Sequence, residues 1–338
     1  MKSIVKVNAP KGFQIKRKDR IIRRRHNIVT GTELLNMKEE EIPHLWDPFI
    51  PSTGLSSLVG SSDLGKSSLL RQLATAVALK NKEFLGQKLN VKHGRAIYFS
   101  TEDSKIATSI ILKRQVGKDV KADDLENLVY ILNNDNAYNA INTELEMAKY
   151  DLVVIDAFSD VFDGQINDIG SVRRFLNKFD KLANKHECSI IFLHHNGKRT
   201  EALNPHKNNI IGSQGFEAKM RTVMELRPND QLHKRELGFL KGNYILDDRK
   251  RETLLLEFNE NQQFSYIETK GVTSIKRGRE FSLEEKQAIL EKAKEYREAG
   301  LSLDKTKDAL NTDFEKVPSK GTLSNWLKEG QEDVQSVE

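Results

Sequence analysis

The chain has 338 residues, 38% hydrophobic and 30% charged, which is long enough for one large core and a smaller module. No apolar run approaches the roughly 18 residues of a membrane span, and no secretory signal is seen, so we expect a cytoplasmic protein that does not enter the membrane. The single cysteine, Cys188, excludes an intrachain disulfide and a thiolate zinc site, and we expect a buried, inert thiol.

Residues 1–45 are predicted to form a basic N-terminal arm. Although the net charge is only +5, ten lysines and arginines precede residue 30 and only one acid, Asp19, accompanies them. Such clustering is typical of segments that contact nucleic-acid phosphates. A solvated tail and a strap on a neighbouring subunit remain alternatives.

Residues 46–269 are predicted to form an α/β domain with a mainly parallel sheet and helices on both faces, because short β-rich apolar runs alternate with helix-length patterns. The predicted strands are 55–59, 95–100, 128–132, 152–155 and 189–193, and the predicted helices are 66–79, 104–116, 137–149 and 171–186. Four further runs, 222–226, 236–241, 253–258 and 263–268, are expected to extend this sheet in an antiparallel manner.

The first predicted strand is followed by a P-loop (Walker A) pattern, G-x-x-x-x-G-K-S, placed before a helix as its mechanism requires. Its glycines let backbone N–H groups point at phosphates, Lys66 neutralises phosphate oxygens, and the hydroxyl of Ser67 is a Mg²⁺ ligand. The sequence therefore predicts ATP and Mg²⁺ as cofactors. The expected nucleotide-binding residues are Gly60, Ser61, Ser62, Asp63, Leu64, Gly65, Lys66, Ser67 and Ser68.

Two acids follow the strand 95–100. A carboxylate at this position is suited to orienting and deprotonating the water that attacks a γ-phosphate, and we expect Glu102 to be this general base. Asp103 is expected to cap the next helix, although the two roles could be exchanged.

The strand 152–155 ends in Asp156, which the pattern places at the carboxyl edge of the sheet beside the P-loop. We expect Asp156 to hold Mg²⁺ together with Ser67. The strand 189–193 ends in His194 and His195 near the same edge, and one of them is a candidate sensor of the γ-phosphate. A purely structural histidine is the alternative.

The motifs Tyr-Phe-Ser-Thr-Glu-Asp, Val-Val-Ile-Asp and Ile-Phe-Leu-His-His, together with the P-loop, resemble the RecA-like superfamily and in particular its RepA-like branch of hexameric replicative helicases. The resemblance covers residues 46–244 and implies that His195 is the sensor. It also implies that Arg221 is an arginine finger for the neighbouring subunit and that Lys241 is a second positive group at that boundary. The P-loop departs from the family pattern at 61–64, where Asp63 adds a negative charge near the phosphates.

The polar, basic segment 196–209 suits a loop in a ring's central channel, with Lys198, Arg199 and Lys207 as candidate DNA contacts. A solvent loop without function is the alternative. After a basic linker at 270–280, residues 281–330 are predicted to form a small all-α module with helices near 282–297, 303–310 and 319–328. The module looks like a helix-turn-helix that presents Lys320, Thr322 and Asn325 to DNA. A subunit-docking bundle is the competing interpretation.

The leading hypothesis is a DNA-dependent ATPase that forms a ring, with a hexamer expected from the resemblance, and acts as a helicase in replication of a plasmid or mobile element. The expected partner is single-stranded DNA. Two alternatives remain: a RecA-like ATPase of recombination or repair that does not unwind DNA, and an initiator or regulator whose DNA binding is controlled by ATP.

Overall fold

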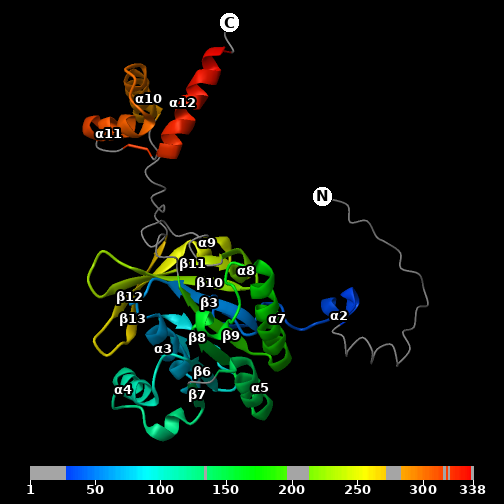
Figure 1. Ribbon diagram of the computed structural model, residues 1–338. Helices are drawn as coiled ribbons and strands as arrows, with labels where there is room; N and C mark the ends of the chain where they lie inside the picture. The colour runs from blue at the N-terminus through cyan, green and yellow to red at the C-terminus, as the bar shows by residue number, and fades with distance from the viewer. Residues whose placement is uncertain are drawn as a thin grey trace, which may run out of the picture. The chain divides into compact units, whose positions relative to one another are not determined.

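The computed structural model describes residues 28–132, 135–195, 213–271, 283–314, 317–318 and 320–335 (Figure 1). The chain divides into two compact units, Met1–Val272 and Thr273–Glu338. The first is an α/β domain, and the described part of the second is helical.

A nine-stranded sheet forms the centre of the first unit, in the order β13-β12-β11-β10-β3-β9-β8-β6-β7. Its strands are β3 (Gly54–Gly60), β6 (Ala96–Ser100), β7 (Leu128–Leu132), β8 (Leu152–Asp156), β9 (Ser189–His195), β10 (Thr222–Pro228), β11 (Lys234–Gly242), β12 (Glu252–Phe258) and β13 (Phe264–Gly271). The six strands from β10 to β7 in this order are parallel, and β11, β12 and β13 continue the sheet in an antiparallel manner. The predicted fold class is therefore confirmed.

One strand pairs differently from the prediction. The sequence was expected to turn antiparallel from 222 onward, but β10 lies parallel to β3, with Thr222 opposite Ser56 and Glu225 opposite Val59. Because β10 lies on one side of β3 and β9 on the other, the P-loop strand is interior to the sheet. The antiparallel extension begins one strand later, at β11.

Helices cover both faces of the sheet, and alternate strand residues point to each face. On one face α3 (Lys66–Ala78) packs against Leu58, Tyr98 and Val154. On the other face α5 (Ala137–Met147), α6 (Phe158–Val161), α7 (Ile169–His186) and α8 (Ser213–Glu217) cover Leu55, Phe99 and Phe192, among others (Figure 1). Cys188, at the start of β9, is a buried free thiol as predicted, and burial raises its pKa to about 12.

Smaller elements close the edges of this domain. The helix α2 (Gly31–Leu35) precedes the short strands β1 (His44–Trp46) and β2 (Ile50–Pro51), and the pair β4 (Glu83–Phe84) and β5 (Gln87–Lys88) follows α3. The indole N–H of Trp46 donates to the carbonyl of Phe84 over 2.8 Å and ties these two pairs together. α4 (Lys105–Val116) and the 3₁₀ helix η1 (Ala122–Leu125) connect β6 to β7, and α9 (Asp247–Lys250) connects β11 to β12.

The second unit contains three helices in its described part, α10 (Leu283–Glu298), α11 (Leu303–Asp313) and α12 (Lys320–Gln335). Their core consists of Ile289, Ala293, Leu310 and Leu323. Ser302 begins α11, and its hydroxyl accepts a hydrogen bond from the N–H of Lys305. The three helices correspond to the three predicted from the sequence.

Candidate functional site

The P-loop joins the end of β3 to the start of α3, and its backbone requires glycine at both ends. Gly60 has φ +152°, and a Cβ there would lie 2.4 Å from the carbonyl oxygen of Leu226 on β10. Gly65 has φ +88° and is the N-cap of α3. Because glycine has no side chain to cap the helix, the first amides of α3 are left to a ligand, which is the arrangement that binds phosphate.

Asp63, the unusual acid of this loop, also has a left-handed backbone, with φ +61°, and its side chain is exposed. Aspartate is one of the few residues besides glycine that adopt this conformation readily. The chain therefore keeps the loop's backbone shape at a position where the family pattern has small residues and glycine.

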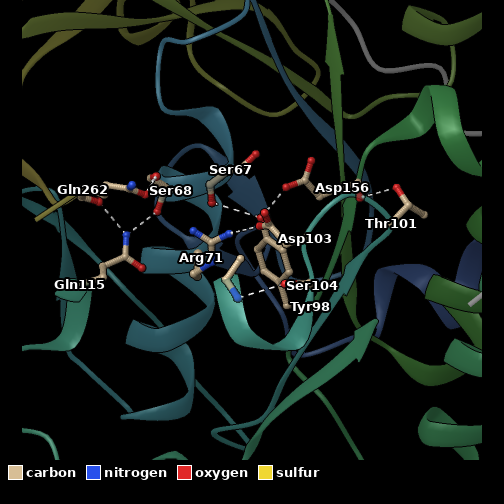
Figure 2. A network of polar contacts seen from close by, with 11 residues as sticks. Ser67, Ser68, Arg71, Tyr98, Thr101, Asp103, Ser104, Gln115, Asp156 and Gln262 are labelled. Carbon is tan, nitrogen blue, oxygen red and sulfur yellow. Dashed lines mark hydrogen bonds and ion pairs between the residues drawn. The ribbon is translucent and has the colours of Figure 1, made fainter. Parts of the chain in front are cut away.

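Lys66 and Ser67 begin α3 and extend toward the loop and the sheet. The side chain of Lys66 is buried, and its Nζ donates to the carbonyl of Ser61 at 2.5 Å. The hydroxyl of Ser67 lowers the pKa of the nearby carboxyl of Asp156, and the phenol of Tyr98 donates both to the carbonyl of Ser67 and to Asp156 (Figure 2). The structure thus brings the ammonium and the hydroxyl expected to serve the phosphates and Mg²⁺ to one corner of the sheet.

Asp156 ends β8 and is buried against Tyr98 of β6. The phenol of Tyr98 donates to Oδ2 of Asp156 over 2.7 Å and also lies 3.1 Å from the carbonyl of Ser67. Burial raises the pKa of Asp156, and the hydrogen bonds from Tyr98 and Ser67 oppose this rise. Burial also raises the pKa of Tyr98 well above its ordinary value, so the phenol remains a donor.

The pair of Ser67 and Asp156 fits a magnesium site of the P-loop kind. A hydroxyl and one carboxylate supply hard oxygen ligands, and this ion ordinarily completes its shell with water and substrate phosphates. In the described part of the chain no group of three or more His, Cys, Asp and Glu residues could hold a metal.

Glu102 lies just beyond β6, opposite the P-loop, and is exposed. Desolvation raises its pKa above the ordinary value, the charges of Asp156, Asp160 and Asp103 raise it further, and Lys66 opposes the rise. A carboxyl group of raised pKa close to the phosphate-binding lysine has the properties of a general base.

Asp103 does not cap the following helix, which corrects the prediction. Ser104 is the N-cap of α4, and its hydroxyl accepts from the N–H of Ala107. The carboxylate of Asp103 instead accepts from the guanidinium of Arg71 at 3.0 Å (Figure 2). Serine outranks a preceding aspartate here because only its backbone position lets the side chain reach the first turn.

Arg71 is a functional candidate that the sequence analysis missed. It lies one turn after Ser67 on α3, is only 2% exposed, and stacks 5.4 Å above the ring of Tyr98. Its charge also opposes the rise in pKa that burial gives the phenol of Tyr130 on β7. The available signal was a single arginine between leucines in a helix next to the P-loop, where a buried arginine needs a partner.

Two neighbouring histidines have opposite surroundings because successive strand residues point to opposite faces. His194 is buried between the rings of Phe158 and Phe216, at centroid distances of 5.0 and 4.6 Å. His195 lies on the side of Lys66, where desolvation and the charge of Lys66 lower its pKa while Asp156 and Asp160 oppose this shift. The geometry therefore favours His195 over His194 as the residue that contacts a phosphate.

Asp160 and Thr101 lie on the acidic side of the site, and the sequence analysis did not identify them either. The hydroxyl of Thr101 donates to Oδ2 of Asp160 over 2.6 Å, and Asp160 bears on the pKa of both Glu102 and His195. Asp160 belongs to α6, four residues after Asp156. No spacing rule in the sequence would have distinguished it from a surface acid.

Comparison with known proteins decides the family. A sequence model described as an AAA domain matches residues 22–201, which include the P-loop, Glu102, Asp156 and His195. The chain belongs to the AAA domain family. A search of the curated proteins found no match.

The fold of this AAA domain is also found in a solved structure described as an ATPase domain. The two share 13% sequence identity, with a TM-score of 0.53, over 72% of this chain and 98% of that chain. The likeness extends to a RecA-like P-loop ATPase fold with its mixed sheet and covering helices. Among the described residues, no helix has the length and apolar character needed to cross a bilayer.

A hairpin beyond the matched family segment closes one side of the AAA domain's P-loop. The stacked rings of Phe258 and Phe264 lie 4.5 Å apart and stand so close to Gly65 that an added Cβ would be 3.0 Å from each ring. At the tip, Gln262 accepts from the hydroxyl of Ser68 over 3.0 Å, and Gln115 of α4 donates both to Ser68 and to Gln262 (Figure 2). Ser68, predicted as a nucleotide-binding residue, thus joins α3 to α4 and to the hairpin.

The two residues implied to act across a subunit boundary lie far from the P-loop of their own chain. Arg221 precedes β10 beside Gly54, the first residue of β3, whereas the P-loop follows the last residue of that strand. Lys241 lies at the same end of the sheet, where its Nζ donates to the carbonyl of Glu217 over 2.8 Å. Neither side chain is placed to serve its own phosphate site.

The candidate DNA contacts are only partly within the described residues. Lys198, Arg199 and Lys207, like the basic arm up to residue 27, lie outside them. On α12, Lys320 is paired with Asp304 at 2.6 Å, whereas Thr322 and Asn325 are not buried. The side chain of Lys320 nevertheless remains about half exposed, at 52%.

Proposed function

We propose that this AAA domain protein is a DNA-dependent ATPase that forms a ring and acts as a DNA helicase in replication of a plasmid or mobile element. The observation that carries the proposal is the junction of Ser67, Asp156 and Glu102 at the head of the P-loop, with Arg221 and Lys241 at the opposite end of the sheet. In this arrangement one chain supplies the general base and the metal site, and a neighbouring chain supplies the remaining positive charge.

In the proposed reaction the triphosphate of ATP lies against the first amides of α3 and the ammonium of Lys66. Ser67 and Asp156 would hold magnesium, which when bound would neutralise negative charge on the phosphates. Glu102 takes a proton from water as the water oxygen attacks the γ-phosphorus, and the bond to the β–γ bridging oxygen breaks to give ADP and phosphate. His195, on the same side of the sheet, senses the loss of the γ-phosphate.

Subunit boundaries and DNA supply the remaining parts of the proposal. Arg221 and Lys241 of a neighbouring subunit stabilise the charge that develops on the transferred phosphoryl group, as a permanently charged guanidinium is suited to do. Lys198, Arg199 and Lys207 contact single-stranded DNA, and Thr322 and Asn325 of α12 contact DNA through a second, helix-turn-helix-like unit. The resemblance to hexameric helicases supports six subunits.

The decisive experiment measures ATP hydrolysis and strand displacement by the full chain with single-stranded and forked DNA. We expect DNA to stimulate hydrolysis and an annealed strand to be released only with ATP. Glu102→Gln should retain ATP binding and lose hydrolysis by at least about 100-fold, because general-base removal has effects of that order. Hydrolysis without strand release would favour the recombination or repair ATPase. A footprint at one DNA sequence that persists in Lys66→Ala would favour the initiator or regulator.

A further inference from the structure

A phenol lies in the apolar centre of the sheet. Tyr98 is the middle residue of β6, a strand whose five residues are all buried, and none of its surface is exposed. Phenylalanine packs in such surroundings without a polar atom, as Phe99 does on the opposite face of the same strand. Because a buried hydroxyl costs free energy unless it is hydrogen-bonded, the partners of this phenol indicate what its hydroxyl is for.

Both partners of the Tyr98 hydroxyl belong to the candidate site. Oδ2 of Asp156 lies 2.7 Å away, and the carbonyl oxygen of Ser67 lies 3.1 Å away. The phenol has a single hydrogen, and the carboxylate is the nearer acceptor and the charged one, so the hydrogen bond to Asp156 is the stronger of the two. This bond engages one oxygen of Asp156 and fixes the plane of the carboxylate, which sets the direction of the other oxygen.

Arg71 holds the ring of Tyr98 from α3. Its guanidinium carbon lies 5.4 Å from the ring centroid, and the side chain is almost fully buried, so the cation is fixed over the ring inside the protein. The same guanidinium donates to Oδ2 of Asp103 over 3.0 Å (Figure 2). Asp103 directly follows Glu102 in the chain. Arg71 therefore contacts both the ring that holds Asp156 and the segment that carries Glu102.

We propose that Tyr98 is a positioning residue of the magnesium site, in which its hydroxyl orients the carboxylate of Asp156 and Arg71 fixes the ring that carries this hydroxyl. This role rests on the proposed function, because it concerns the magnesium that accompanies ATP. A contact that orients a ligating carboxylate commonly changes metal affinity by about 10- to 100-fold. Tyr98 itself touches neither the nucleotide nor the reacting atoms and acts only through Asp156.

The test compares nucleotide binding with and without magnesium. A non-hydrolysable ATP analogue is titrated into the full chain by calorimetry, once with Mg²⁺ and once with EDTA, and the ratio of the Kd in EDTA to the Kd in Mg²⁺ measures what magnesium contributes. In Tyr98→Phe, which keeps the ring and loses only the hydroxyl, this ratio should fall at least about tenfold while the Kd in EDTA stays the same. A loss of packing would instead weaken binding equally in both conditions. An unchanged ratio would overturn the proposal.

Tyr130→Phe is the matched control, because it removes a hydroxyl from a neighbouring ring. The rings of Tyr130 and Tyr98 lie 5.5 Å apart, but β6 separates β7, which carries Tyr130, from β8, which ends in Asp156. The magnesium ratio should therefore be unchanged in this variant. An equal fall in both variants would show that any phenol lost from this region weakens the site, and the specific role of Tyr98 would be wrong.

Arg71→Met tests the second contact and remains informative if Tyr98→Phe does not fold. It removes the cation over the ring and should lower the same ratio by less than Tyr98→Phe does, because the hydroxyl is still present. The double variant should have a ratio no lower than that of Tyr98→Phe alone, since two residues that act through one contact are not additive. An unchanged ratio in Arg71→Met, or two effects that multiply in the double variant, would contradict this role of Arg71.

Failure of this role and failure of the proposed function give different results. A chain whose magnesium ratio depends on Tyr98, but which neither hydrolyses ATP nor releases a DNA strand, would refute the proposed function and leave the role of Tyr98 in place. An unchanged ratio in Tyr98→Phe, in a protein that hydrolyses ATP and unwinds DNA, would refute the role of Tyr98 and leave the proposed function in place.

Discussion

At the scale of single residues, acids crowd the site around one lysine. Glu102 faces Asp156, Asp160 and Asp103, and Lys66 is the cation that opposes them. Each carboxylate makes the next one harder to ionise, because like charges within a few ångströms disfavour the charged form. The protonation state of Glu102 is therefore set by its neighbours as well as by its own desolvation.

This crowding predicts a pH dependence of hydrolysis. If Glu102 is the general base, as proposed, the reaction requires its carboxylate form. Because the pKa of Glu102 is raised, activity should then fall with decreasing pH sooner than for an ordinary glutamate. Asp160→Asn removes one repelling charge, lowers the pKa of Glu102 and should move the acid limb of the kcat profile to lower pH. Asp163→Asn, an exposed acid in the same segment, is the control and should leave the limb unmoved. An acid limb that does not move in Asp160→Asn would contradict the assignment of Glu102 as the base.

The ion pair of Arg71 and Asp103 is unequal, and its two halves should respond differently to removal. Arg71 is 2% exposed, whereas the side chain of Asp103 is 31% exposed. Asp103→Ala leaves a guanidinium buried without its carboxylate, and the free energy of unfolding should fall by about 3 kcal/mol. Arg71→Met leaves the carboxylate of Asp103, which water can reach, so the free energy of unfolding should fall by less. Urea denaturation of the two variants measures the difference, and an equal or reversed order would show that the burial of Arg71 is not what matters.

At the scale of elements, the hairpin of β12 and β13 is packed onto the P-loop through Gly65. Gly65 and Gly117 both have positive φ, at +88° and +72°, but only Gly65 has rings within 4 Å of an added Cβ. Gly117→Ala should reduce the free energy of unfolding by about 2 kcal/mol, because φ +72° with ψ −158° is a backbone region that is almost restricted to glycine. Gly65→Ala should reduce the free energy of unfolding by more, because the rings of Phe258 and Phe264 must move to make room for the added Cβ. ATP binding should weaken in the same variant. Similar losses for both variants, measured by denaturation and nucleotide titration, would argue against this packing.

The elements that the sequence predicted well are those with a strong local pattern. The strands ending at Gly60, Asp156 and His195 are buried apolar runs that stop at polar residues, and such runs indicate parallel strands whatever the partner. The P-loop was recognisable because its glycine spacing, its lysine and both flanking elements agree. Glu102 and Asp156 followed from their places at the ends of strands.

What the sequence could not predict depends on contacts between distant segments. The parallel pairing of β10 with β3 has no local signature, since a strand's own pattern does not record the direction of its partner. The interactions of Gln262 with Ser68 and of Arg71 with Asp103 link segments 194 and 32 residues apart. The residues themselves left the choice between His194 and His195 open and only the family resemblance pointed to His195, because the side of β9 that faces Lys66 is known only from the packed sheet.

At the scale of the whole molecule, the chain separates nucleotide chemistry from a second helical unit. Unit two has a core of its own, with Leu310 and Leu323 fully buried, and Thr322 and Asn325 of its α12 lie outside that core. If the two units have separate tasks, a change on one surface should leave the other task unchanged.

This separation gives a further prediction. Asn325→Ala in the full chain should weaken binding to duplex DNA about tenfold, the effect of losing one good base contact, while hydrolysis of ATP without DNA stays the same. Lys320→Ala should have a smaller effect, because Lys320 is already paired with Asp304. Fluorescence anisotropy and a phosphate-release assay measure the two quantities. Unchanged DNA affinity in Asn325→Ala would favour the subunit-docking interpretation of this unit.

The parallel arrangement of β3 and β10 gives the ATPase unit a front and a back. Gly60 and Arg221 lie at opposite ends of these neighbouring strands. A neighbouring chain in the reversed orientation would therefore place its own P-loop, and not its guanidinium, beside the first chain's P-loop. In a two-fold dimer that pairs the same ends of the two sheets, both nucleotides would lack an arginine finger. If Arg221 acts as proposed, every productive assembly has a polarity, and the direction of travel along a DNA strand is built into the order of two strands in the sheet.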